Sequence, residues 1–210
     1  MLKKKLLVGK GILVVIYLVG IIGLANPLWR PYFVVFTPIT LLISALVLFY
    51  FHEEWNRFWY GFMSVAFIAG FSIEAIGVAT GSVFGSYHYS SILGPQLLGT
   101  PLIIGINWLI LVYASGVIMS KFPGAKIVKV VGGALMMVLL DLAIEPVAVK
   151  LNFWTWKGNE IPVINYISWF IISFVLLWIF YSLSFKKNNR IAFFFYMVQI
   201  VFFVFLSFML

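Results

Sequence analysis

Long apolar segments alternate with short polar ones along the whole chain. Each apolar segment is close to the roughly 20 residues that a helix needs to cross the hydrocarbon core of a bilayer. The segments lie at 6–25, 32–51, 58–80, 102–119, 127–149, 163–183 and 191–210. They lack a period of two, and backbone groups in lipid must be paired within their own segment, so helices are favoured over barrel strands. The pattern predicts an all-α fold, a polytopic transmembrane bundle of about seven helices forming one integral-membrane domain over residues 1–210.

The composition supports a membrane protein. Of the 210 residues, 64% are hydrophobic and 10% are charged, against about 45–50% and 25% in soluble domains. Too few polar residues remain to coat a water-soluble globule. The chain has no cysteine and two histidines, which argues against disulfides, thiolate sites and a His-rich metal centre. We expect no metal and no cofactor.

The basic residues indicate a topology. There are 14 Lys and Arg against 6 Asp and Glu, but they lie between apolar segments and form no basic face, so we expect no nucleic-acid partner. Eleven fall in connections on the N-terminal side, and only Arg30, Lys150 and Lys157 fall on the other. The positive-inside rule then predicts a multi-pass protein of a bacterial-type inner membrane, with the N-terminus inside and the C-terminus outside. Because Lys10 shortens the first segment, a cleaved signal peptide over residues 1–25 stays an alternative.

Three acids fall inside predicted helices: Glu74, Asp141 and Glu145. An ionised, unpaired acid at the centre of a membrane helix costs roughly 2.5–3.5 kcal/mol, and no Lys or Arg lies in the middle of a segment. Desolvation therefore favours the neutral acid. At 1.5 Å per residue all three reach a similar depth toward the outer side. Asp141 and Glu145 are four residues apart and share a helix face. We expect a shared acid site, with simple bonding between helices as the alternative.

The surroundings of the acids are also informative. The helix face of Glu74 carries Gly70, Gly77 and Gly81, which predicts close approach of a neighbouring helix. Two outer connections, 81–101 and 150–162, are long and aromatic and are expected to fold over the bundle as a pocket wall. The polar and aromatic candidates at this level are Phe84, Tyr87, Tyr89, Asn107, Trp108, Trp154, Trp156, Asn165, Tyr166 and Trp169. Each aromatic residue alone also suits the interfacial belt of a membrane protein.

The two histidines lie on opposite sides of the predicted bundle. His52 lies with Glu53, Glu54 and Arg57 in an inner connection, where we expect solvated side chains. His88 lies in an outer connection and is a candidate for proton exchange.

Over about 70–183 the chain carries a specific set of acids, glycines and aromatic residues. The runs are Glu74-Ala-Ile-Gly-Val-Ala-Thr-Gly81, Phe84-Gly-Ser-Tyr-His-Tyr89, Leu93-Gly-Pro95, Asp141-Leu-Ala-Ile-Glu-Pro-Val-Ala148, Trp154-Thr-Trp156 and Pro162-Val-Ile-Asn165, with Pro101, Trp108 and Trp169. This part of the chain resembles the integral-membrane carotenoid biosynthesis proteins typified by carotenoid 1,2-hydratases acting on γ-carotene or bisanhydrobacterioruberin.

The resemblance implies a hydro-lyase that adds water across the terminal C1=C2 double bond of an acyclic ψ-end carotenoid. Asp141 is the expected proton donor and Glu145 or Glu74 the water-positioning base, with these roles interchangeable. The substrate-binding residues are then Tyr87, Tyr89, Trp108, Trp154, Trp156, Asn165 and Trp169. The expected partners are a lipophilic carotenoid, water, membrane lipid and other enzymes of carotenoid biosynthesis.

Four other functions stay open. A carotenoid end-ring cyclase shares the protonation step and captures the cation with an internal alkene. A membrane prenyltransferase could use Asp141 and Glu145 to bind a magnesium diphosphate, although Lys and Arg are scarce on the outer side. A proton-coupled transporter and a pigment-binding membrane protein also use buried acids.

Overall fold

The computed structural model describes residues 2–210 and is mostly helical. Within that range seven helical segments are long and apolar enough to cross a membrane, which confirms the predicted fold class. The long helices are α1 (Leu2–Ala25), α3 (Thr37–Tyr50), α4 (Arg57–Thr80), α5 (Ile103–Ser120), α6 (Lys126–Lys150), α7 (Val163–Ser182) and α8 (Ala192–Met209).

The second predicted helix is not continuous. It consists of α2 (Arg30–Phe33), a 3-10 turn, η1 (Val34–Phe36), and α3. Pro31 and Pro38 lie in the first turns of α2 and α3. A proline has no N–H to donate and its ring crowds the preceding turn, so the segment restarts at each proline.

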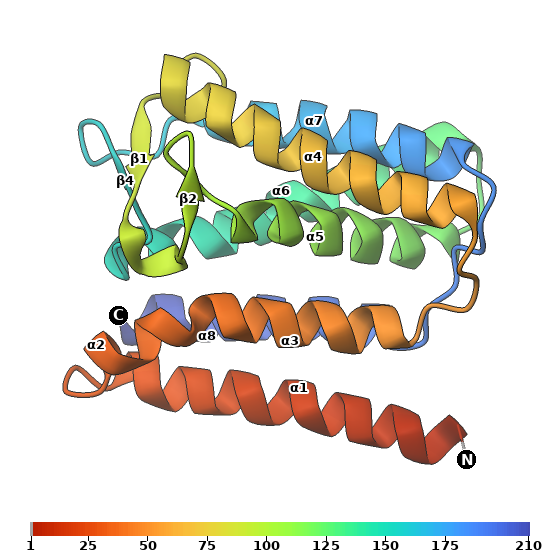
Figure 1. Ribbon diagram of the computed structural model, residues 1–210, viewed down its shortest axis with the longest axis horizontal. Coiled ribbons are helices and arrows are strands. Elements are labelled where there is room, and N and C mark those ends of the chain that lie inside the picture. The colour runs from red at the N-terminus through yellow and green to blue at the C-terminus, as the bar shows by residue number, and fades with distance from the viewer. Residues whose placement is uncertain (1) are drawn as a thin grey trace.

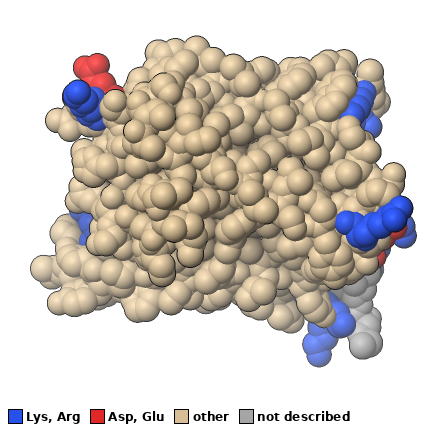
Figure 2. Space-filling model, turned by 45° about the horizontal axis from the view of Figure 1, so that its top comes forward, with Lys and Arg blue, Asp and Glu red and all other residues tan. Residues whose placement is uncertain are grey.

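The helices form two groups that lie side by side (Figure 1). Helices α4, α5, α6 and α7 pack around one another, and α1, α3 and α8 form a layer against α5 and α6. Helix α5 runs through the centre and is buried along most of its length. The outer helices expose large apolar side chains, and charged side chains gather at the two ends of the face shown in Figure 2. This surface suits a bilayer around the middle of the bundle.

Short strands cover one end of the bundle, which we call the loop end (Figure 1). Strand β1 (Tyr87–Tyr89) pairs antiparallel with β4 (Trp154–Trp156), which joins the two long aromatic connections. Strand β2 (Gln96–Leu97) pairs with β3 (Thr100–Pro101) in the same connection as β1. A 3-10 turn, η2 (Ser91–Leu93), lies between β1 and β2.

At the opposite end, the expectation that His52 is solvated is wrong. His52 is 5% exposed, and its ring stacks on Trp59 with 3.9 Å between centroids. Its Nε2 lies 2.7 Å from the backbone oxygen of Glu54, and its Nδ1 lies 2.8 Å from the hydroxyl of Tyr113. Both ring nitrogens have partners, so the imidazole is buried without losing hydrogen bonds.

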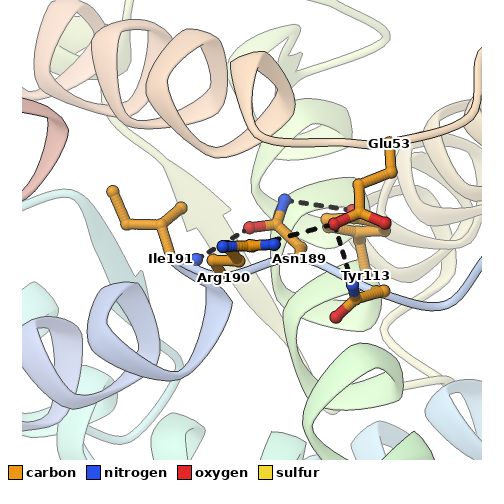
Figure 3. Close-up of polar contacts among 6 residues, drawn as sticks. Glu53, Tyr113, Asn189, Arg190 and Ile191 are labelled. Atoms are coloured by element: carbon orange, nitrogen blue, oxygen red, sulfur yellow. Dashed lines mark hydrogen bonds and ion pairs between the residues drawn. The ribbon is translucent and has the colours of Figure 1, made fainter. Parts of the chain in front are cut away.

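Asn189 completes this cluster (Figure 3). Its Nδ2 donates to the Tyr113 hydroxyl at 3.1 Å and to the backbone oxygen of Leu48 at 2.7 Å, and its Oδ1 accepts from the N–H of Ile191. These bonds tie the α7–α8 connection to α3 and α5. Burial lowers the pKa of His52 below its usual value, so the neutral imidazole belongs to the folded state.

Candidate active site

Glu74 lies in the outer part of α4 and is 5% exposed. Its Oε2 accepts hydrogen bonds from the hydroxyls of Tyr87 at 2.5 Å and Tyr89 at 2.8 Å, and its Oε1 accepts from Nε1 of Trp108 at 2.9 Å. A carboxyl group whose two oxygens both accept short hydrogen bonds is best served when it is ionised, because a carboxylate only accepts. These hydrogen bonds therefore favour an ionised Glu74, whereas its burial favours the neutral acid expected from the sequence.

The two tyrosines are suited to remain donors. Burial, together with the nearby charge of Glu74, raises the pKa of Tyr87 and that of Tyr89. Both phenols keep their protons, so their hydrogen bonds to Glu74 persist over the ordinary pH range.

Glycines let bulky side chains reach Glu74. A Cβ on Gly70 would lie 2.4 Å from the Cβ of Trp108, which shows the close approach of α5 that the sequence predicted. Gly77 and Gly81 act differently from the prediction. A Cβ on Gly77 would meet the ring of Phe84 in the loop, and Gly81 ends α4 with a φ of 66°, a left-handed conformation that glycine adopts without strain.

The other two acids lie one turn apart on α6, and both are buried. Oε2 of Glu145 accepts from Nε1 of Trp154 at 3.0 Å and from Nε1 of Trp156 at 2.9 Å. The Nδ2 of Asn165 on α7 donates to Oδ2 of Asp141 at 2.8 Å and lies 3.4 Å from Oε1 of Glu145. Asn165 thus links the two carboxyl groups.

Asp141 has a less complete set of partners. It is 1% exposed, and its Oδ1 is buried without a hydrogen-bond partner among the described residues. An unpartnered ionised oxygen in such a place costs far more than an unpartnered neutral one. The structure therefore fits a protonated Asp141 beside Glu145.

The register of β1 and β4 connects the acids on α4 and α6. Tyr87 lies opposite Trp156 and Tyr89 opposite Trp154, with ring centroids 4.8 Å and 5.7 Å apart. Alternate residues of a strand point to the same face, so both aromatic residues of each strand reach the bundle. The phenols bind Glu74, while the indoles bind the carboxyl group of Glu145 on α6. Each cross-strand pair joins the two acid-bearing helices.

A cavity of about 30 Å³ lies among these groups. Its lining comprises Glu74, Phe84, Tyr87, Tyr89, Ile104, Asn107, Trp108, Ile144, Glu145, Trp154, Trp156, Asn165 and Trp169. A buried site needs at least about 10–15 Å³ to hold a water molecule, so this cavity has room for about two. The rings of Trp108 and Trp169 stack at 4.2 Å along its wall.

The sequence predicted ten site residues, namely three acids and seven substrate-binding residues. Nine of these ten line the cavity, and Asp141 does not. Asp141 is instead hydrogen-bonded to Asn165, which does line the cavity. The lining also includes Ile104 and Ile144, for which the sequence gives no signal beyond apolarity, and Asn107, which the sequence marked. Tyr166 was another candidate from the sequence, and it does not line the cavity.

The cavity offers acid, base and cation-stabilising groups. Two carboxyl groups from different helices face it, and the indole and phenol rings around them can stabilise a cation. No Lys or Arg lines it. Among residues 2–210 no group of three His, Cys, Asp or Glu side chains is arranged to hold a metal ion. The donors around each carboxyl group suit proton transfer between protein and a neutral molecule.

Seven candidate membrane spans and a cavity lined by buried acids define a polytopic membrane protein with a buried polar site. The particular family follows from comparison with known proteins. The chain belongs to the carotenoid biosynthesis protein family, which it matches over residues 31–210.

A curated relative refines this comparison. The chain is 27% identical over 123 residues to bisanhydrobacterioruberin hydratase of Haloarcula japonica. The match covers 52% of this chain and 40% of the length of that relative. No solved structure matches this chain.

Proposed function

We propose that this protein is a carotenoid hydratase, a hydro-lyase that adds water to the terminal C1=C2 bond of an acyclic ψ-end carotenoid. The observation that carries the proposal is the water-sized cavity faced by Glu74 and Glu145 and walled by indole and phenol rings. The related hydratase from Haloarcula japonica supports the same reaction class.

The first step is protonation of the alkene. Asp141 does not line the cavity, so in this proposal Glu145 takes the donor role and delivers a proton from Oε1 to C2. Its Oε2 stays bound to the two indole N–H groups, while its Oε1, which lies 3.4 Å from Nδ2 of Asn165, has room to carry the proton. The π electrons of the double bond form the new C2–H bond, and C1 becomes a tertiary cation. Aromatic faces stabilise such a cation by roughly 0.5–2 kcal/mol each when desolvated.

The second step is capture by water. Asn165 and Glu74 orient a water molecule in the cavity, its oxygen bonds to C1, and Glu74 takes the released proton. Tyr87, Tyr89 and Trp108 hold Glu74 as a carboxylate beforehand. A proton then returns from Glu74 to Glu145 through cavity water. The net reaction consumes one water and no proton.

Asp141 supplies the third part of this proposal. It is a neutral acid linked to Glu145 through Asn165, so it adds no second negative charge beside the donor. Like charges close together disfavour the ionisation of both groups. Asp141 therefore acts as a positioning residue that sets the proton affinity of Glu145.

The substrate comes from the bilayer. The end of a ψ-end carotenoid is larger than the water-sized cavity, so aromatic side chains of the wall move aside when it binds. A polyene dissolved in lipid reaches the site between helices. The protein works in this proposal as one integral-membrane domain, in a bacterial-type inner membrane with the loop end outside, beside other enzymes of carotenoid biosynthesis.

Expression in a bacterium that makes lycopene or γ-carotene tests the proposal. We expect a product heavier than the substrate by the mass of one water, with one hydroxyl group at C1. A ring cyclase would give an isomer of unchanged mass. Unchanged pigment with membrane-inserted protein, over several acyclic carotenoids, would refute the hydratase.

A further inference from the structure

A second hollow lies at the loop end, directly outside the acid cavity. It has a volume of about 310 Å³ and is lined by Ser86, Tyr87, His88, Trp156 and Lys157. We call it the antechamber. Three of its lining residues, Ser86, His88 and Lys157, are exposed, so water fills it. It belongs to the β1–β4 end of the molecule, away from the apolar middle of the bundle (Figure 1).

The antechamber and the acid cavity share two residues, Tyr87 and Trp156. These are partners across the β1–β4 sheet and are 8% and 4% exposed. The hydroxyl of Tyr87 donates to Glu74, and Nε1 of Trp156 donates to Glu145. This pair of rings therefore lies between the antechamber and the cavity, and each ring holds one of the two acids that face the cavity.

Away from the β1–β4 sheet, where Tyr89 and Trp154 are half-buried lining residues as well, most of the cavity wall is apolar. It includes Ile104, Ile144 and the stacked rings of Trp108 and Trp169, which belong to helices α5, α6 and α7 within the bundle. A cavity with room for about two water molecules must be refilled at nearly every turnover of a hydration reaction.

We propose that the antechamber is the access site for reacting water, and that the Tyr87–Trp156 pair is the gate through which it passes. The inference rests on the proposed hydration and names the source of its second substrate. Water reaches the acids from the aqueous phase at the loop end, while the carotenoid reaches them from lipid. Movement of the paired rings admits water without opening the helices.

The chain has no cysteine, so one introduced thiol can be blocked selectively. A His88→Cys variant in detergent is assayed before and after reaction with a methanethiosulfonate reagent carrying a trimethylammonium group. We expect the hydration rate to fall at least tenfold after modification, with carotenoid binding unchanged. Glu160→Cys is the matched control, because Glu160 is exposed in the same connection as Lys157 and does not line the antechamber.

Complete modification of His88→Cys by mass spectrometry with an unchanged rate would overturn the proposal. If that variant fails to fold, Ser86→Cys replaces it, since Ser86 lines the same hollow. A loss of rate for both His88→Cys and the Glu160→Cys control would also overturn it, because the effect would then not depend on the antechamber.

A second measurement separates this inference from the proposed function. Radiolytic hydroxyl-radical footprinting oxidises side chains that lie beside water, whatever the protein catalyses. We expect Trp156 to be oxidised and the fully buried Trp59 at the other end to be protected. We also expect modification at position 88 to protect Trp156. Protection of Trp156 from the start would overturn the water route. Oxidation of Trp156 in a protein without hydration activity would keep the route and refute the hydratase alone.

Discussion

Replacement of Glu145 by Gln removes one proton site and little else. In the parent protein the indole Nε1 atoms of Trp154 and Trp156 lie 3.0 Å and 2.9 Å from Oε2 of Glu145. The carbonyl oxygen of the new amide can still accept from both. The amide nitrogen takes the place of Oε1, where it faces Nδ2 of Asn165 at 3.4 Å. Two donors then meet, so one weak hydrogen bond is lost while the packing of α6 stays the same.

The expected effects of Glu145→Gln on stability and on the hydration rate differ in size. Loss of one hydrogen bond that is already long lowers the free energy of unfolding by about 1 kcal/mol. Loss of the general acid lowers the rate by about 10²–10⁴-fold, which is about 2.7–5.5 kcal/mol of activation free energy. A hydratase therefore becomes nearly inactive while its fold persists.

The assay is conversion of an acyclic carotenoid by purified protein in detergent or nanodiscs, followed by mass and chromatography. Thermal unfolding and membrane yield are measured on the same samples. The control is Glu160→Gln, an exposed acid outside the site, for which we expect unchanged rate and stability. A Glu145→Gln protein that hydrates within threefold of the parent would refute the proton-donor role.

Three further predictions address residues around and beyond the cavity. Asp141→Asn keeps a neutral side chain and an oxygen that accepts from Asn165, so we expect a hydration rate within about threefold of the parent in the same assay, and a loss of tenfold or more would show that Asp141 itself transfers a proton. Gly70→Ala brings a Cβ to 2.4 Å from Trp108 and is expected to lower the free energy of unfolding by about 1–3 kcal/mol, whereas Gly61→Ala on the same helix meets open space and is expected to be nearly neutral. The pKa of His52 is lower in the folded protein, so unfolding below a pH of about 6.5 takes up a proton. The contribution of His52 to stability is therefore full above that pH and falls as the pH is lowered below it. Thermal unfolding measured against pH checks this, and we expect a His52→Gln variant to show a weaker pH dependence.

The helices were predictable from the sequence because lipid imposes one rule on each of them. A segment must be long, apolar and internally bonded, and the observed helices follow the predicted segments closely. The break between Arg30 and Tyr50 was missed because hydropathy does not register the absent N–H groups of Pro31 and Pro38. Proline spacing within an apolar segment carries that signal.

The site was predictable as a set of residues and less so as a geometry. Spacing placed Asp141 and Glu145 on one face, but their difference in access depends on Asn165 of another helix. The pairing of β1 with β4 joins strands of three residues from distant connections, too short for a pattern to establish. The alternating aromatic residues of Tyr-His-Tyr and Trp-Thr-Trp are the sequence pattern that corresponds to this pairing.

Burial of His52 was missed for a related reason. Its polar neighbours in the sequence suggest solvent, whereas the groups that satisfy its ring come from elsewhere. Tyr113 belongs to α5, and Asn189, which holds the Tyr113 hydroxyl, lies after α7. A buried polar residue is stable when its partners are supplied, and no local pattern reports partners that lie 61 residues away.

The β1–β4 sheet determines when the acids of the bundle can carry charge. An ionised acid in a membrane helix costs roughly 2.5–3.5 kcal/mol without partners. Glu74 receives two of its three donors from β1, and hydrogen bonds to charged groups contribute about 1.5–3 kcal/mol each. The two phenols therefore oppose the cost of burying this charge. Helices that insert before the loops pair would hold neutral acids, and folding of the loop end would create the carboxylate that the proposed water capture needs.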